Sequence, residues 1–264
     1  MSDLQKPDPK AVAKALEEQR AYEKERQTRF GKGAEKVTAP LGGLVSKLVP
    51  PELVRAGLEA ADKLVGVTLP DGLIGHDLSD IAACEAAARR VQAWSAGTNA
   101  ASGGLTGWFG AAGVAADIPA TITLAARNVR ATGAAYGFAE VSDEERAYRL
   151  LILEAATTSA GERRGETLKG LGDMAEWMNT PEGRIVLDKG GEWVSEKVVE
   201  RIARQLGVNL GSRKAGQVVP IVGGAVAAVV NASFQTDVSR AARYAYRLRW
   251  LMARKLLPEP EENS

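Results

Sequence analysis

The chain has 264 residues, of which 45% are hydrophobic and 25% are charged. These fractions are typical of folded globular proteins, so disorder over most of the chain is excluded. The 34 lysines and arginines nearly balance 33 acidic residues, which leaves a net charge of +1. Proteins that bind nucleic acid usually carry a basic surplus, so no nucleic-acid partner is expected.

The cysteine content and the first residues both favour a reducing compartment. Cys84 is the only cysteine, which excludes an intramolecular disulfide and a cysteine-based zinc site. The first ten residues, MSDLQKPDPK, lack the apolar core of a signal peptide. We therefore expect a cytoplasmic protein, peripheral on the inner face of the cell membrane if it meets the membrane at all. No metal or cofactor is expected, because the usual phosphate-binding and metal-binding motifs are absent.

Residues 1–39 are predicted to form a charged N-terminal arm outside the folded domain. After Pro9, strong helix formers alternate in charge and apolar positions are sparse, which is typical of a solvated helix. Such a helix docks lightly on the domain or binds a partner. The folded domain is expected over residues 40–257, and residues 258–264 form an acidic tail.

The pattern over residues 77–96 predicts an amphipathic helix. Apolar side chains recur at spacings of three and four between Ile81 and Trp94, which gives the helix one buried face. Asp77 or Ser79 is the expected cap at its start.

Residues 142–160 are predicted to form a second helix with a capping box. Ser142 is the cap, and Glu145 stands three residues further on. Glu145 and Arg149 are expected to pair on the solvent-facing side. Residues 161–179 are polar and contain several glycines, which favours a loop and a short helix.

Two long stretches with almost no charge are the most distinctive feature of the sequence. Asp117 is the only charged residue in 98–126, and residues 215–236 contain none. Small residues four apart in the first stretch allow helices to approach closely. Asp117 and Pro119 are expected to divide that stretch into two elements. We therefore predict a soluble, all-α fold, a single multi-helix domain with two buried Gly/Ala-rich central helices.

Asp117 is the leading candidate for a functional carboxylate, since an ionised acid in apolar surroundings is costly unless it is paired or hydrogen-bonded. A structural Asp117 would cap a helix that Pro119 opens, or pair with Arg127 or Arg130. In an enzyme, Asp117 would be catalytic, with Arg127 orienting it and Asn231 nearby.

The last helix is predicted to be basic and amphipathic, which is typical of helices that lie on anionic membrane surfaces. The expected membrane or anion contacts are Arg240, Arg243, Arg247, Trp250, Arg254 and Lys255. A second interpretation makes it a core helix whose arginines pair with acids elsewhere in a neutral protein.

Several short motifs occur in a characteristic order over residues 76–257. They are Asp117-Ile118-Pro119, Arg127, Tyr136-Gly137-Phe138, Glu144-Glu145-Arg146, and a step from Pro220 through Gly223 to Asn231. In this ordered set the chain resembles the EcsC protein family, although Ala139 stands where the family pattern has an acid. The resemblance implies a bacterial, mainly helical protein, and the family's namesake is associated with an ABC-transporter operon without an agreed biochemical activity.

These observations favour a non-enzymatic accessory protein that associates with the cytoplasmic membrane face or with a membrane-transport system. The expected partner is an anionic membrane surface or a membrane protein. The first alternative is a hydrolase-type enzyme centred on Asp117 and Arg127. The second is a carrier whose small-residue helices enclose a lipid or another apolar ligand.

Overall fold

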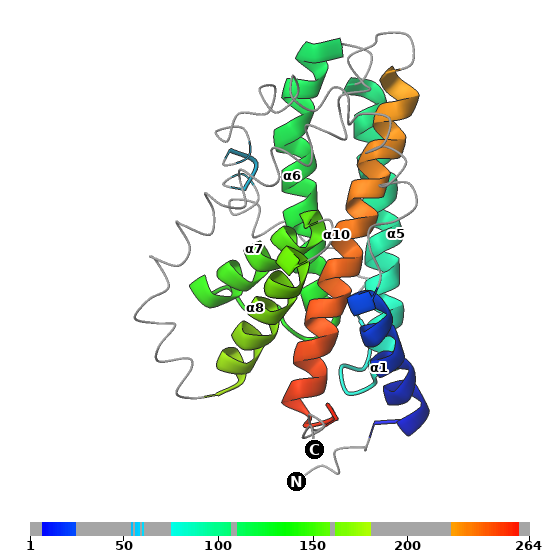
Figure 1. Ribbon diagram of the computed structural model, residues 1–264. Helices are drawn as coiled ribbons and strands as arrows, with labels where there is room; N and C mark the ends of the chain where they lie inside the picture. The colour runs from blue at the N-terminus through cyan, green and yellow to red at the C-terminus, as the bar shows by residue number, and fades with distance from the viewer. Residues whose placement is uncertain are drawn as a thin grey trace.

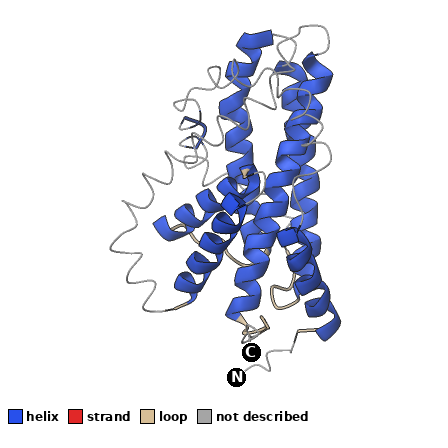
Figure 2. Cartoon of the chain, viewed as in Figure 1, coloured by secondary structure: helices blue, strands red, loops and turns tan. Residues whose placement is uncertain are grey.

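The fold was analysed in a computed structural model that describes residues 7–24, 75–106, 110–158, 162–180 and 223–258, with 54, 56–58 and 60. Within these ranges it describes the backbone alone at 98–106, 110–117, 162–163 and 223–231. Every regular element in the described residues is an α-helix (Figure 2), which confirms the predicted all-α class.

The helices pack around one long C-terminal helix (Figure 1). Its neighbours lie on three sides: α5 and α6 run alongside it over most of its length, α7 and α8 pack together on one flank, and α1 lies near its C-terminal end. The bounds are α1 Pro9–Lys24, α5 Ile81–Thr106, α6 Gly110–Ala135, α7 Asp143–Thr157, α8 Glu162–Asn179 and α10 Gly223–Ala253.

These helices share one hydrophobic core, as expected for a single domain. Ile122 of α6, Tyr148 of α7, Leu171 of α8 and Trp250 of α10 are among its fully buried members. None of the described helices is long and apolar enough to cross a membrane.

Both predicted helix starts are present, with one change of cap. The Ser142 hydroxyl accepts a hydrogen bond from the Glu145 amide at 3.2 Å, as the capping pattern predicts. At the start of α5, however, the cap is Asp80, whose carboxylate accepts from the Ala82 amide at 2.8 Å. Asp77 instead accepts from Ser79 within the preceding turn.

The first uncharged stretch is divided earlier than predicted. α6 already begins at Gly110 and continues through Pro119, so neither Asp117 nor Pro119 starts a helix. The Thr123 hydroxyl donates to the Pro119 carbonyl at 2.8 Å and to the Gly57 carbonyl at 3.0 Å. A helical turn thus crosses α6 closely here, and a Cβ at Gly57 would lie 2.8 Å from the Ile122 Cβ.

Two other helix boundaries differ from those that the sequence favours, because tertiary packing outweighs residues that locally disfavour a helix. α10 is one continuous helix that contains residues 223–236 of the second uncharged stretch and the basic segment that follows them. Asp237 therefore lies inside this helix. α8 is a single helix over 162–179, despite the glycines that favour a loop. At Gly165, Gly170 and Gly172 nothing lies within 4 Å of an added Cβ.

Within the predicted N-terminal arm, α1 docks on the bundle. It contacts α10 and α5, and its Ala15 and Gln19 side chains are buried. The rest of the predicted arm, residues 1–6 and 25–39, and Pro220 of the last family motif lie outside the described residues.

Gly133 is the position where α6 comes closest to α10. A Cβ there would lie 2.7 Å from the Tyr246 ring and 2.9 Å from the Phe138 carbonyl oxygen. We expect Gly133→Ala to lower the free energy of unfolding by roughly 1–3 kcal/mol, because the buried ring and the backbone must shift. Urea denaturation measures this change.

The matched control is Gly170→Ala in α8, where a methyl group meets nothing. It should be neutral or stabilise by up to about 1 kcal/mol through helix propensity. Equal effects of the two substitutions would contradict the close approach at Gly133.

Candidate functional site

A cluster of buried charges joins α1, α5 and α10. We call Glu18, Glu85, Arg89, Arg243 and Arg247 the ion cluster. Each helix brings its members together by regular spacing: Glu85 and Arg89 are four apart on α5, and Arg243 and Arg247 are four apart on α10. Glu18 comes from the facing side of α1.

The centre of the ion cluster is the pair between Glu85 and Arg247. The Arg247 Nε donates to Glu85 Oε1 at 2.5 Å, and the Tyr136 hydroxyl donates to the same oxygen. The Arg247 side chain is 2% exposed and that of Glu85 is 6% exposed. Two charges taken out of water at this depth require close pairing and further hydrogen bonds, and the Tyr136 hydroxyl supplies one.

Glu18 is the outer acid of the ion cluster. Its two oxygens accept from three arginines: Arg89 at 3.3 Å, Arg243 at 3.2 Å and Arg247 at 2.8 Å. Its side chain is 26% exposed, and that of Arg89 is 45% exposed. The ion cluster therefore extends from a buried pair to the solvent edge of α1.

The surroundings of Glu85 favour its charged form. Burial by itself raises the pKa of this carboxyl, but the charge and hydrogen bond of Arg247, the Tyr136 hydroxyl and the charge of Arg243 together lower it below its ordinary value. Conversely, burial and the neighbouring Glu85 raise the pKa of the Tyr136 phenol well above its usual range. At neutral pH the pair is thus an ionised carboxylate with a protonated phenol.

A second buried arginine lies among aromatic rings on the opposite side of α10. The Arg249 guanidinium lies 4.1 Å from the centre of the Phe138 ring and 5.0 Å from that of Tyr148. Its Nη1 donates to Glu145 Oε1 at 2.6 Å. The expected pair between Glu145 and Arg149 is present, with 3.9 Å between Arg149 Nη1 and Glu145 Oε2. It does not lie on the solvent-facing side, however, because Glu145 is 1% exposed.

Glu145 titrates in the opposite direction from Glu85. Burial raises its pKa, and the attraction of Arg249 and Arg149 only partly offsets that effect. The folded state therefore takes up a proton here more readily than the unfolded chain does. The contribution of Glu145 to stability is present in acid and is lost as the pH rises through its folded pKa.

Neutral polar side chains also join α6 to α10. The Asn128 amide donates to Gln235 Oε1 at 3.1 Å and to the Ser239 hydroxyl at 2.8 Å. Gln235 in turn donates to the Thr121 carbonyl at 3.3 Å. Since buried polar groups need partners, these bonds fix the register of the two helices.

The structure does not bring the predicted catalytic residues together. Asp117 and Arg127 lie on one continuous helix, about 15 Å apart along its axis at ~1.5 Å per residue, so they cannot pair, and Arg130 lies further still. The Arg127 guanidinium stacks instead at 4.6 Å over the Trp94 ring. Asn231 lies in a part of α10, and Asp117 in a part of α6, where only the backbone is described.

The predicted membrane contacts divide into buried and exposed residues. Arg247 and Trp250 are buried, so neither reaches a membrane surface in this fold, and this expectation is corrected. Arg243 is mostly buried in the ion cluster, and Arg240 is half-buried. Arg254 and Lys255 are exposed at the C-terminal end of α10.

Arg254 also has a local structural role. Its guanidinium lies 3.9 Å over the Trp250 ring and donates to the Leu78 carbonyl at 3.1 Å. The structure thus supports the second interpretation of the basic helix, in which arginines pair with groups elsewhere in the protein.

Sequence reasoning missed Glu85, Tyr136 and Glu18. The weak signal for Glu85 was its place beside the apolar stripe of α5, directly after Cys84. Nothing in the sequence indicated that α1 would bring Glu18 to the same point. Among the described residues, no group of histidine, cysteine and acidic side chains is arranged to hold a metal ion.

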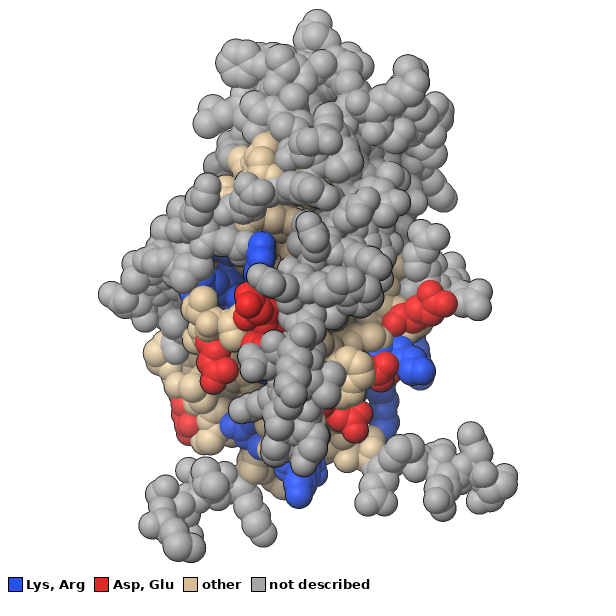
Figure 3. Space-filling view, turned by 90° about the vertical axis from the view of Figure 1, so that its left-hand side faces the viewer, with Lys and Arg blue, Asp and Glu red and all other residues tan. Residues whose placement is uncertain are grey.

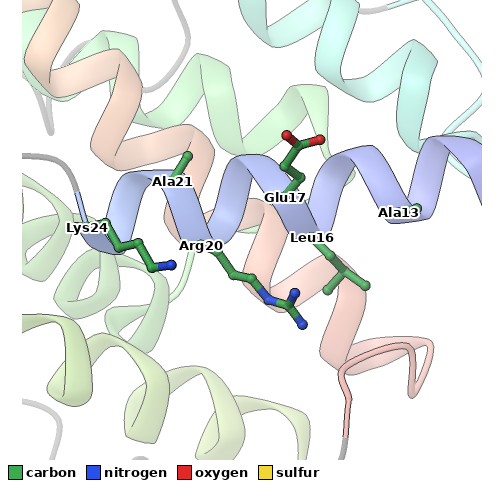
Figure 4. Close-up of a pocket in the computed structure, with 6 residues that line it drawn as sticks. All are labelled: Ala13, Leu16, Glu17, Arg20, Ala21 and Lys24. Carbon is green, nitrogen blue, oxygen red and sulfur yellow. The ribbon is translucent and has the colours of Figure 1, made fainter.

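An open groove borders the outer face of α1. Its described lining consists of Ala13, Leu16, Glu17, Arg20, Ala21 and Lys24 (Figure 4). All of these residues belong to one helix, and Leu16 and Arg20 project to the same side. No acid–base pair converges on the groove, so we assign no chemistry to it.

Comparison with known proteins gives one match. The sequence pattern of the EcsC protein family matches residues 13–251. That range includes every member of the ion cluster and most of α1. Neither a curated protein nor a solved structure matches the chain significantly.

The energetic role of the ion cluster can be tested at its centre. We expect Glu85→Gln to lower the free energy of unfolding at pH 7 by about 3 kcal/mol, because Arg247 remains buried without its main counter-charge. Urea denaturation measures the change. Glu17→Gln on the exposed face of α1 is the control and should change stability by less than about 0.5 kcal/mol.

The same substitution should also remove part of the pH dependence of stability. The pKa of Glu85 in the folded protein is below the ordinary value of 4.5. Its contribution is therefore complete above that value and is lost as the pH falls through the folded pKa. The stability difference between wild type and Glu85→Gln should be largest near neutral pH and shrink in acid. A difference that stays constant from pH 7 to pH 3 would exclude this role.

Proposed function

Because the chain belongs to the EcsC protein family, we propose that it is a non-enzymatic accessory protein that associates peripherally with the cytoplasmic membrane or with a membrane-transport system. The surface we propose for this contact is the uncharged end of the bundle, rather than the basic C-terminal helix. We define the uncharged end as the parts of α5, α6 and α10 within residues 91–106, 110–116 and 223–236.

The observation that supports this proposal is the way the chain separates its charges. The three parts contain no charged residue, and they lie together at one end of the molecule (Figure 1). The part of α5 alone is about 24 Å long, at ~1.5 Å per residue. In Figure 3, the described charged residues lie in the lower part of the molecule.

A membrane contact favours such an end on energetic grounds. Moving a charged side chain from water into the acyl region of a membrane costs free energy, whereas small uncharged side chains on a helix do not carry that cost. On α6 the uncharged range ends directly before an acid, Asp117.

Basic residues lie beyond the uncharged end on each helix, after Asp117 on α6 and Asp237 on α10. Arg90 on α5, Arg127 on α6 and Arg240 on α10 are the first basic residues beyond the uncharged end. Trp94 lies at the same level, with the Arg127 guanidinium over its ring. Arginine and tryptophan are the side chains that favour the headgroup region of anionic membranes.

The proposal assigns no reaction, because the buried acids are engaged in packing. Glu85 and Glu145 each have an arginine counter-ion, and each pair joins α10 to a neighbouring helix. The distance between Asp117 and Arg127 along α6 gives no support to a catalytic pair of these two residues.

Charged substitutions in the uncharged end test the proposal. Glutamate is introduced in turn at Ala100, Ala101 and Ser102, since successive helix positions point about 100° apart and at least one should face away from neighbouring helices. Co-sedimentation with vesicles of phosphatidylglycerol and phosphatidylethanolamine is measured. We expect wild type to bind and at least one variant to bind about tenfold less, because a charge must enter the interface.

Ala86→Glu, at an exposed position in the charged half of α5, is the matched control and should bind as wild type does. Thermal unfolding by circular dichroism must show that each variant is folded. Absence of wild-type binding to anionic vesicles would overturn the membrane part of the proposal, as would equal binding by all folded variants.

A further inference from the structure

α1 is held to the bundle by apolar packing of Val12, Leu16 and Tyr22 and by several polar contacts. Its buried side chains are Ala15 and Gln19, whereas α7 buries ten residues. Gln19 donates to the Tyr244 carbonyl at 3.3 Å, and Glu23 accepts from the Tyr244 hydroxyl at 3.2 Å. α1 thus has fewer fully buried side chains than α7, which places it in the part of the fold that opens more readily.

The strongest of these contacts is a single carboxylate among three guanidinium groups. Arg89, Arg243 and Arg247 all approach the Glu18 carboxylate within 3.3 Å. Arg243 and Arg247 are fixed from behind, because Arg243 donates to Gln92 and Arg247 donates to Glu85. Arg243 and Arg247 therefore each have a partner outside α1, although Arg247 also donates to Gln19 of α1 at 3.5 Å. Glu18 occupies the point where the three arginines converge.

We propose that this convergence point is a binding site for a phosphate group, and that the Glu18 carboxylate of α1 occupies it as an internal substitute. Binding of a phosphomonoester or of inorganic phosphate displaces Glu18 and releases α1 from α10. The inference does not depend on the membrane contact proposed above, which lies at the other end of the bundle.

Charge and geometry both favour phosphate over the carboxylate. Without Glu18 the three arginines face Glu85 alone, which leaves an excess of two positive charges. A phosphomonoester carries a charge of about −1.5 to −2 near pH 7 and offers three acceptor oxygens. Guanidinium groups donate in a planar fork that suits these oxygens. Glu18 supplies a single negative charge and only two oxygens for three donors.

The site is also accessible before α1 leaves. Glu18 and Arg89 are partly exposed at the edge of α1, so an anion can contact Arg89 first. Each arginine that donates its hydrogen bond to phosphate instead of Glu18 weakens the docking of α1. Since a ligand that binds only the undocked state shifts the equilibrium toward it, phosphate binding and α1 release are coupled.

The test compares wild type with Glu18→Gln, which removes the competing charge and keeps the shape of the side chain. Isothermal titration with inorganic phosphate is performed in chloride buffer of matched ionic strength. We expect about tenfold tighter binding by Glu18→Gln, because charge-assisted bonds to the internal competitor are lost. Glu17→Gln, one residue away on the exposed face, should bind phosphate as wild type does.

Hydrogen exchange of the α1 amides supplies a second readout. Phosphate should accelerate exchange over Pro9–Lys24 in wild type and leave α7 unchanged. Adding Arg243→Gln to Glu18→Gln should weaken phosphate binding about tenfold while thermal unfolding shows that the protein remains folded. The proposal is overturned if neither wild type nor Glu18→Gln binds phosphate, or if phosphate binds without any change in α1 exchange.

Vesicles then distinguish the two sources of the phosphate group. Binding of Glu18→Gln to phosphatidic acid vesicles, but not to phosphatidylcholine vesicles, would assign the site to a lipid headgroup. Binding of inorganic phosphate without binding of phosphatidic acid vesicles would assign it to a soluble phosphate compound. Both results support the site, because each requires phosphate to occupy the three arginines.

Discussion

The buried salt bridge between Glu85 and Arg247 is the constraint on which the packing of α5 against α10 depends. Its charges are costly to bury unless both are fully engaged, and Tyr136 and Glu18 complete their surroundings. A shift of one residue along α10 would turn Arg247 by about 100° and leave Glu85 buried without a partner. The pair therefore selects one register of the helices that form the centre of the bundle.

The polarity of the helix contacts changes along α10. Near its C-terminal end, the ion cluster and the Arg249–Glu145 pair join it to α1, α5 and α7. Further toward its N-terminus, the neutral amides Asn128 and Gln235 make the contact with α6. Beyond them the helix has no charge at all. Helix pairs held by charges respond to salt and pH, so the two ends of the molecule differ in what can disturb them.

This division relates the two proposals to each other. The uncharged end is the contact that we propose for a membrane or a membrane protein. The charged end holds α1 through contacts that an anion can replace. In these two proposals, the middle of the docking region and the middle of the ion cluster are about 23 Å apart along α10 at ~1.5 Å per residue.

The sequence by itself determined the helical class, the family resemblance, the apolar face of α5 and the Ser142 cap, because these depend on local spacing and short-range hydrogen bonds. Tertiary structure decided the rest. Pro119 and the glycines of α8 remain inside helices because packing outweighs local breakers, and Glu18, Glu85 and Arg247 meet only when distant segments fold together. Periodicity shows that a side chain faces inward, but the identity of its partner depends on contacts between distant segments.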